Sequence, residues 1–273
     1  MNTVNLHQLD QISLIEVRGE DAATIVNNLT TNQVKELESG QGRESFVTDV
    51  RGKTLGHVCM YRDETTIRML GPAGQSEAVA AHVDKYTIRE DATPSILDGD
   101  FAAIVLSPPA AVLLQISVQD GVELKCLETE FAGTRVRAYG TRWLGDGTVV
   151  LVFAPDAADS VSRAVLEQLD AAGCSGAVLG NEATFHDQRT RVGFPWYGID
   201  LDDTNLPQEA DRDDVAICFT KGCYLGQETV ARLDALGQVQ KKLVRWSISG
   251  GIPEGGTTLE SDGKKVARLT SVS

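Results

Sequence analysis

The stretch Lys221-Gly222-Cys223-Tyr224-Leu225-Gly226-Gln227-Glu228 is the part of this chain around which the rest is organised. A helix is expected to follow it over residues 227–236, so Cys223 stands just ahead of a helix start, with Lys221 nearby. The free backbone N–H groups and the positive dipole end of such a helix favour a thiolate over a thiol, and a nearby lysine adds to that field. The residues alone leave two interpretations open: a reactive Cys223, or a small residue buried in a tight turn.

The longer run KGCYLGQETVAR, residues 221–232, resembles the signature of the YgfZ-like folate-binding proteins. These proteins are relatives of the T-protein (aminomethyltransferase) of the glycine cleavage system. Other segments resemble the same group: GEDAATIVNNLTTNQV at 19–34, D-x-x-G-K at 49–53, R-x-x-x-G-x-P at 189–195 followed by Tyr-Gly at 197–198, and L-P-x-E at 206–209. The resemblance covers essentially the whole chain and is strongest at residues 15–53 and 185–245.

Composition excludes several classes of function. The net charge of −14 argues against a chain-wide affinity for nucleic acid, because neutralising phosphates requires Lys and Arg. The five cysteines form no CxxC pair, which argues against a zinc ribbon or a thioredoxin-like site. The acidic loop with Asp200, Asp202 and Asp203 fits no EF-hand frame, so no metal site is predicted. Neither a signal peptide nor a membrane-spanning helix is expected, and the expected setting is cytoplasmic.

The order of strand and helix patterns predicts an α+β fold. Strands are expected at residues 13–17, 45–50, 54–61, 65–70, 102–106, 112–116, 122–127, 134–141 and 148–153, and helices at 73–86, 155–171 and 181–192. Residues 91–101 are interpreted as a connection between lobes. The resemblance implies a T-protein-like three-lobed arrangement around a central folate-sized cavity, with residues 221–228 at its rim. Its parts are two α+β lobes, 1–97 and 98–240, which are free to interleave, and a small C-terminal β-barrel begun by 241–273.

The C-terminal part predicts only three strands, at residues 242–248, 257–260 and 265–270. Three strands can hardly close a barrel, and an open sheet leaves an edge of unpaired backbone groups. We therefore expect one of two arrangements. Either the native chain is longer than these residues, or they form a three-stranded flap that buries Leu243, Leu259 and Leu269 against the first two lobes.

The resemblance also bears on function. T-proteins take an aminomethyl carbon onto tetrahydrofolate and use an aspartate after an asparagine-containing stretch, whereas residues 70–75 here contain neither residue. Where T-proteins place a glutamate toward the pterin ring, this chain has Arg191, which cannot accept hydrogen bonds. These departures favour the YgfZ-like group and imply a folate-binding accessory protein for iron–sulfur cluster assembly or repair, or for tRNA modification. The alternatives are a tetrahydrofolate-dependent aminomethyl- or methyltransferase and a folate-responsive interaction module without chemistry.

Candidate site residues follow from the resemblance. Cys223 is expected to be the most reactive of the five thiols, with Lys221 favouring its thiolate. Cations in the motif segments are expected to meet the anionic glutamate tail of folate. The expected folate contacts are Asp49, Lys53, Arg189, Arg191, Tyr197, Gln227, Glu228 and Arg232. The expected cofactor is tetrahydrofolate or a one-carbon derivative, and the expected partners are folate and iron–sulfur client or assembly proteins.

Overall fold

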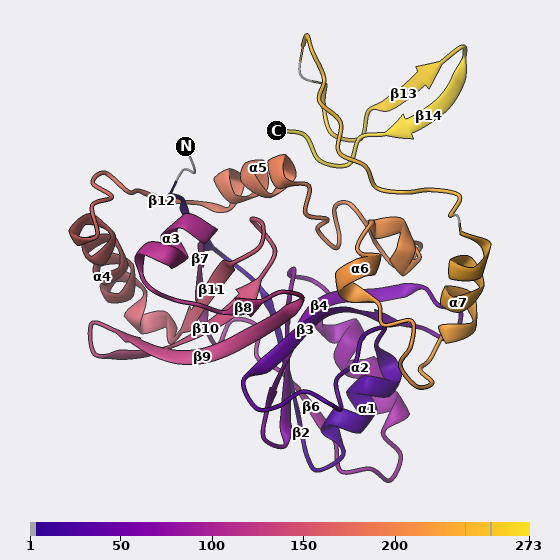
Figure 1. Ribbon diagram of the computed structural model, residues 1–273, viewed down its shortest axis with the longest axis horizontal. Helices are drawn as coiled ribbons and strands as arrows, with labels where there is room; N and C mark the ends of the chain where they lie inside the picture. Colours follow the sequence, from indigo (N-terminus) through magenta and orange to yellow (C-terminus); the bar gives the residue numbers. More distant parts are fainter. Residues whose placement is uncertain (1–3, 238, 252) are drawn as a thin grey trace.

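A computed structural model describes residues 4–237, 239–251 and 253–273. Within these residues one mixed sheet of 12 strands dominates, and Figure 1 shows it between α4 on one side and α1 and α2 on the other. The strand order is β12-β1-β7-β11-β10-β9-β3-β4-β5-β2-β6, with β8 paired to β9. The architecture is α+β, as predicted. The strand bounds are β1 Leu6–Leu9, β2 Ser13–Arg18, β3 Gln41–Thr48, β4 Thr54–Asp63, β5 Thr66–Gly71, β6 Thr93–Ile96, β7 Ala102–Leu106, β8 Gln119–Asp120, β9 Glu123–Phe131, β10 Thr134–Thr141, β11 Thr148–Phe153 and β12 Leu179–Gly180.

The half of the sheet formed by β2 to β6 carries two helices on one face, α1 (Ala22–Leu29) and α2 (Ser76–Tyr86). Val58 and Met60 of β4 point to this face and are buried with apolar residues of both helices. The predicted hairpin is confirmed, since β3 and β4 pair antiparallel around the turn at residues 49–53. The face of β3 and β4 opposite to the helices remains for later parts of the chain to cover.

The other half is built from β7 and β9 to β11 and is packed by α3 (Pro108–Leu113) and α4 (Ala158–Ala171). The N-terminal strand β1 joins this half by pairing with β7, and β3 pairs with β9 where the two halves meet. The strand predicted at 112–116 is wrong. Pro108 and Pro109 occupy the first turn of a helix, where a missing N–H costs nothing. The strands β1 and β6 were not predicted.

After the second half, residues 182–236 lead back toward the first half, and we call them the return segment. It forms α5 (Glu182–Val192), a 3-10 turn η2 (Pro207–Ala210), α6 (Asp213–Ala216) and α7 (Gln227–Leu236), with a further 3-10 turn η1 (Pro155–Ala157) ahead of α4. The returning chain bonds to the first half at Thr54, whose N–H donates to Asn205 O at 3.0 Å. A small apolar cluster packs Phe46 of β3 together with Leu201, Tyr224 and Val230 of the returning chain.

The described part of residues 239–273 does not form the expected three-stranded flap, and the alternative, a longer native chain, stays a prediction. Residues 242–248 form no strand, and the only sheet here is a hairpin of β13 (Thr258–Ser261) and β14 (Lys264–Arg268). Figure 1 shows this hairpin, in yellow, projecting from the rest of the molecule. Leu243, Leu259 and Leu269 are each half-buried rather than buried. These described residues therefore form neither a closed barrel nor a packed three-stranded flap.

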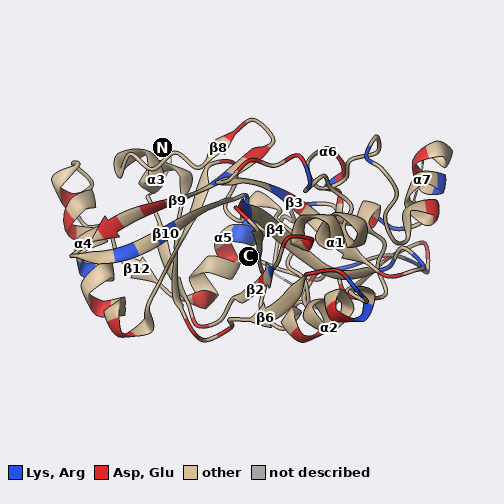
Figure 2. Ribbon diagram, turned by 90° about the horizontal axis from the view of Figure 1, so that it is seen from below, with Lys and Arg blue, Asp and Glu red and all other residues tan. Residues whose placement is uncertain are grey.

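The charge is spread over the surface. Figure 2 shows acidic residues on α2, α4 and α7 and along exposed loops, with basic residues interspersed. None of the helices that the structure describes combines the length and apolar character needed to cross a membrane.

Candidate functional site

The segment with the sequence signature lies on the C-terminal end of α1. We call residues 217–226 the docked segment. The N–H of Cys218 donates to Thr31 O at 2.9 Å, and the N–H of Leu225 donates to Asn28 O at 2.8 Å. The last carbonyl groups of a helix have no partner within the helix, so they require donors from elsewhere. The docked segment supplies those donors, and two motif segments far apart in sequence thereby become one structural unit.

Lys221 makes the largest contribution to this contact. Its Nζ donates to three main-chain oxygens, Asn27 O at 2.7 Å, Thr30 O at 2.8 Å and Asn32 O at 2.7 Å. The same nitrogen lies 5.1 Å from the centre of the Tyr224 ring. Burial lowers the pKa of Lys221 to about 7. All three ammonium donors are thus occupied by carbonyl groups, which gives Lys221 a role in holding the docked segment, while its expected effect on the Cys223 thiol stays a prediction.

Gly226 lets the docked segment approach the β3–β4 turn. It has φ 82°, and a Cβ at this position would lie 2.4 Å from Asp49 O and 2.7 Å from the Cα of Gly52. A Cβ at Gly52, which has φ 78°, would lie 2.9 Å from the Cβ of Thr229. Both positions combine a left-handed backbone with a contact that leaves no room for a side chain. The structure therefore brings the D-x-x-G-K turn and the start of α7 into direct contact.

Cys223 is exposed, three residues before the N-cap of α7. Cys59 and Cys126 lie in the sheet, where burial raises their thiol pKa to about 12 and about 11. Cys174 and Cys218 are half-buried. A thiol with a raised pKa is a poor nucleophile at neutral pH. The expectation that Cys223 is the most reactive thiol stays a prediction, with two of its four rivals disfavoured.

Other predicted residues lie around the same turn. Asp49 Oδ1 accepts the N–H groups of Arg51 and Lys53, both at 2.8 Å, so this carboxylate shapes the turn. The Lys53 ammonium donates to Thr204 O. Tyr197 approaches Thr54 O at 3.4 Å, and burial, together with nearby Asp203 and Asp202, raises its pKa to about 12. On α7, Gln227 is half-buried, while Glu228 and Arg232 are exposed.

The two predicted arginines of α5 lie elsewhere. Arg189 is buried and donates to Asp200 Oδ2 at 2.6 Å and to Ser271 Oγ at 2.9 Å. Arg191 is exposed and pairs with Asp187 on its own helix. Figures 1 and 2 both draw α5 well apart from α7. The structure thus groups Asp49, Lys53 and Tyr197 with the docked segment, and it leaves the α5 arginines in a separate set of ion pairs.

A buried ion cluster was missed by the sequence analysis. It consists of Glu44, His57, Arg142 and Arg212. Glu44 is fully buried and accepts two bonds from Arg212, at 2.7 and 2.6 Å, and one contact from His57 at 2.9 Å. Arg142 Nη1 lies 3.7 Å from it. Burial by itself would raise the pKa of Glu44, but Arg212 and His57 hold that pKa well below its usual range.

This cluster lies on the face of β3 and β4 that the return segment covers. The His57 ring stacks between Phe46 and Phe194, with ring centres 4.6 and 5.3 Å apart. The signal in the sequence was the presence of Glu44 and His57 inside otherwise buried strands. Such residues need buried partners, because an unpaired charge in a core is strongly destabilising.

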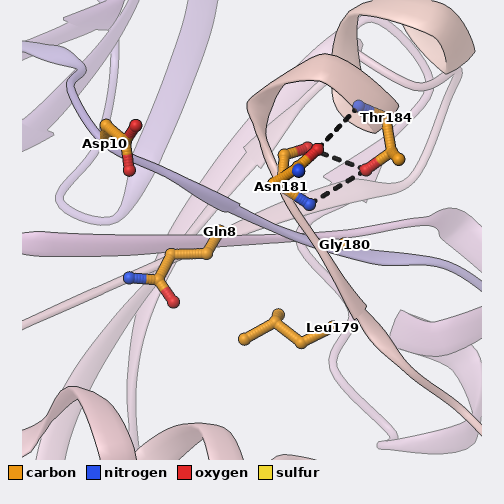
Figure 3. Close-up of a pocket in the computed structure, with 6 residues that line it drawn as sticks. All are labelled: Gln8, Asp10, Leu179, Gly180, Asn181 and Thr184. Carbon is orange, nitrogen blue, oxygen red and sulfur yellow. Dashed lines mark hydrogen bonds between the residues drawn. The ribbon is translucent and has the colours of Figure 1, made fainter.

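Two shallow pockets of the described residues lie away from the docked segment. The first, about 570 Å³, is shown in Figure 3 and lies between β1 and the start of α5. Its lining is Gln8, Asp10, Leu179, Gly180, Asn181 and Thr184. In this pocket Asn181 and Thr184 bond to each other and cap α5. The second, about 330 Å³, lies beside α3. Neither is lined by residues 221–228, so the central folate-sized cavity stays a prediction.

The mixed sheet with its returning segment has the fold of the glycine cleavage T-proteins. The crystal structure of glycine cleavage system aminomethyltransferase T from Bartonella henselae superposes with a TM-score of 0.72, at 19% identity, over 98% of this chain and 73% of that one. The family model described as the GCVT N-terminal domain matches residues 1–217. The chain belongs to this family, which confirms the T-protein superfamily expected from the sequence.

Curated relatives are similar over almost all of this chain. A probable aminomethyltransferase of Natronomonas pharaonis is 28% identical over 94% of this chain and 72% of its own length. An aminomethyltransferase of Rubrobacter xylanophilus is 27% identical over 97% of this chain and 71% of its own length. A putative chloroplastic transferase of Arabidopsis thaliana is 23% identical over 99% of this chain and 62% of its own length.

Proposed function

We propose that this protein binds tetrahydrofolate, or a one-carbon derivative of it, and transfers an aminomethyl or methyl carbon. The observation that carries the proposal is the family match over residues 1–217, joined to relatives named aminomethyltransferases. In aminomethyl transfer the carbon would bridge two folate nitrogens. The two N–H hydrogens of those nitrogens would leave with the donor's carrier atom and with ammonia. This reading replaces the accessory role as the leading one, because the relatives are named for transfer.

Two cations near the docked segment suit the anionic glutamate tail of folate. Lys53 donates to a carbonyl group and Arg232 is exposed, and neither forms an ion pair within the described residues. Both cations therefore remain available for the carboxylates of the glutamate tail. Arg189 and Arg191 already pair with Asp200 and Asp187, so a carboxylate ligand would have to displace those partners.

Calorimetry with tetrahydrofolate tests the binding step. We expect Lys53→Met and Arg232→Met each to weaken binding by about tenfold, as loss of a charge-assisted contact of about 1.4 kcal/mol would do. Arg191→Met is the matched control, since it removes an exposed cation that already has a partner. Absence of binding at millimolar tetrahydrofolate would reject the proposal. The transfer step is tested separately, by measuring the formation of methylenetetrahydrofolate from an aminomethyl donor.

A second candidate is the folate-binding accessory role in iron–sulfur cluster assembly or repair, or in tRNA modification. Two observations favour it. Cys223 is exposed beside the start of α7, and residues 70–75 contain no acid. Gln75 ends that stretch, and its fully buried amide bonds to the main chain of His57 and Pro72. The protein so placed would need client or assembly proteins as partners.

Cys223→Ala separates the two candidates. A transferase that does not use the thiol keeps its turnover in this variant. An accessory protein that depends on the thiol fails to restore iron–sulfur enzyme activities in cells lacking the wild-type protein. Cys174→Ala, at a half-buried thiol outside the docked segment, is the control for loss of a cysteine as such.

A further inference from the structure

The end of α1 and the turn after it present a dense set of carbonyl groups. The oxygens of residues 27, 28, 30, 31 and 32 all accept bonds from the docked segment. Two of these bonds come from main-chain N–H groups, those of Cys218 and Leu225. The other three converge on a single atom, Lys221 Nζ. The contact is therefore focused on one side chain rather than shared evenly.

Three carbonyl oxygens and an aromatic face form a site of defined chemistry. An ammonium group has three N–H donors and no acceptor, and here each donor has one oxygen at 2.7–2.8 Å. The fourth bond of the nitrogen is to its own alkyl chain, and the Tyr224 ring, whose face attracts cations, lies 5.1 Å from the nitrogen. The negative dipole end of α1 also favours a positive group, whereas burial opposes the charge and lowers the pKa of Lys221 to about 7, so the ammonium form belongs to neutral and lower pH. We refer to these four groups as the carbonyl site.

We propose that the carbonyl site is a binding site for a primary ammonium group, which Lys221 fills from within the chain, and that its occupancy positions the docked segment. Lys221 is then a positioning residue for Cys223 and for the Gly226 contact with the β3–β4 turn. This inference rests on the proposed function in one respect only, namely that the docked segment takes part in that function. The site itself is defined by the contacts above.

The proposal predicts chemical rescue. Lys221→Ala removes three methylene groups and the ammonium, which together match n-propylammonium. We expect this variant to exchange the amide hydrogens of Cys218 and Leu225 at least tenfold faster than wild type, and n-propylammonium to restore slow exchange. Tetramethylammonium, which has no N–H, and n-propanol, which has no charge, serve as matched controls and should not restore it. Cys223 alkylation should shift with exchange and return to its wild-type rate on rescue.

Lys221→Met keeps the side chain as far as its fourth heavy atom and fills the space of the alkyl chain without an N–H donor. We expect fast exchange in this variant and no rescue by n-propylammonium, because the site is blocked. If Lys221→Ala folds only when n-propylammonium is present, that also supports the site. Slow exchange in Lys221→Met, or equal rescue of Lys221→Ala by n-propanol, would overturn the proposal.

Tetrahydrofolate binding measured on the same samples separates this proposal from the proposed function. Fast, rescuable exchange in a protein whose wild type binds no tetrahydrofolate supports the carbonyl site and rejects the function. Wild-type binding together with unchanged exchange in both Lys221 variants supports the function and rejects the carbonyl site.

Discussion

The buried ion cluster and the carbonyl site both hold charge away from water, but they stabilise it differently. Glu44 meets a full opposite charge, because the Arg212 guanidinium reaches both of its oxygens, and His57 contacts one of them. Lys221 meets only the partial charges of three carbonyl groups. The pKa values reflect this difference. The pKa of Glu44 lies well below its usual range despite burial, whereas burial lowers the pKa of Lys221 to about 7.

The buried ion cluster and the carbonyl site should therefore lose stability under different conditions. A charge paired with counter-charges is stable while the set is complete and costly when one member is lost. A charge held by dipoles can give up its proton instead, and the carbonyl oxygens then lose one donor without leaving an ion behind. The first site is sensitive to mutation, and the second is sensitive to pH.

The largest effect is expected from Arg212→Met, which removes the side chain that bonds to both oxygens of buried Glu44 and leaves it only the His57 contact and Arg142 at 3.7 Å. We expect the free energy of unfolding to fall by about 3–5 kcal/mol, measured by urea denaturation. The double variant Glu44→Leu/Arg212→Met is the control and should regain most of that loss, since it removes both charges. A loss below about 1 kcal/mol for the single variant would show that the cluster is not a paired unit.

Gly226→Ala tests whether the docked segment depends on its close approach as well as on Lys221. A Cβ here would meet Asp49 O at 2.4 Å on a backbone with positive φ. We expect a loss of about 2–4 kcal/mol, from strain and overpacking together. Gly222→Ala is the matched control, because a Cβ at Gly222 has open space around it and φ outside the positive range. Equal losses in the two variants would contradict the packing argument.

The pH dependence of Lys221 is the next largest effect. The unfolded lysine has a pKa of about 10.4, so between pH 7 and 10 the unfolded chain binds more protons than the folded one. The contribution of Lys221 to the free energy of unfolding therefore rises with pH over that window. Between pH 7 and 9, we expect the free energy of unfolding of wild type to rise by about 1–2 kcal/mol relative to that of Lys221→Met. This rise is within the limit of about 1.4 kcal/mol per pH unit. A flat difference would show that the carbonyl groups hold the ammonium charged.

The smallest effect is expected at Arg191, an exposed cation paired with Asp187 one turn away. Arg191→Ala should change the free energy of unfolding by less than any of the changes above, because exposed pairs of this kind contribute little. Its value lies in calibration, since it shows what loss of a solvated charge costs in this protein. A loss as large as that of Arg212→Met would remove the distinction between buried and surface charge.

Much of the fold could be predicted from local pattern. The strands Ala102–Leu106, Thr134–Thr141 and Thr148–Phe153 and the helix Gln227–Leu236 have the predicted bounds. Each has its own apolar periodicity and clear turn residues at its ends. Residues 242–248 have the alternation too but form no strand, because alternation predicts only what a segment would do beside a partner, and no described strand pairs with it.

The candidate site was harder to predict, since its key contacts join distant residues. Spacing placed Lys221 two residues from Cys223 and suggested an interaction between them. The partners of Lys221 lie instead near the start of the chain, on residues 27–32. Likewise Glu44 and Arg212 are 168 positions apart, and no local pattern indicates which of the many charged residues will pair.

Residues 217–226 can dock onto α1 only late in the synthesis of the chain. Lys221 is separated from its carbonyl partners by 189 to 194 positions. At about 5–20 residues per second, roughly 10–40 s of translation lie between the emergence of α1 and that of its capping lysine. Throughout that interval the end of α1 is hydrated or bound by whatever donor is nearest, on a nascent chain still tethered to the ribosome. A translational pause between these segments would prolong that incomplete state.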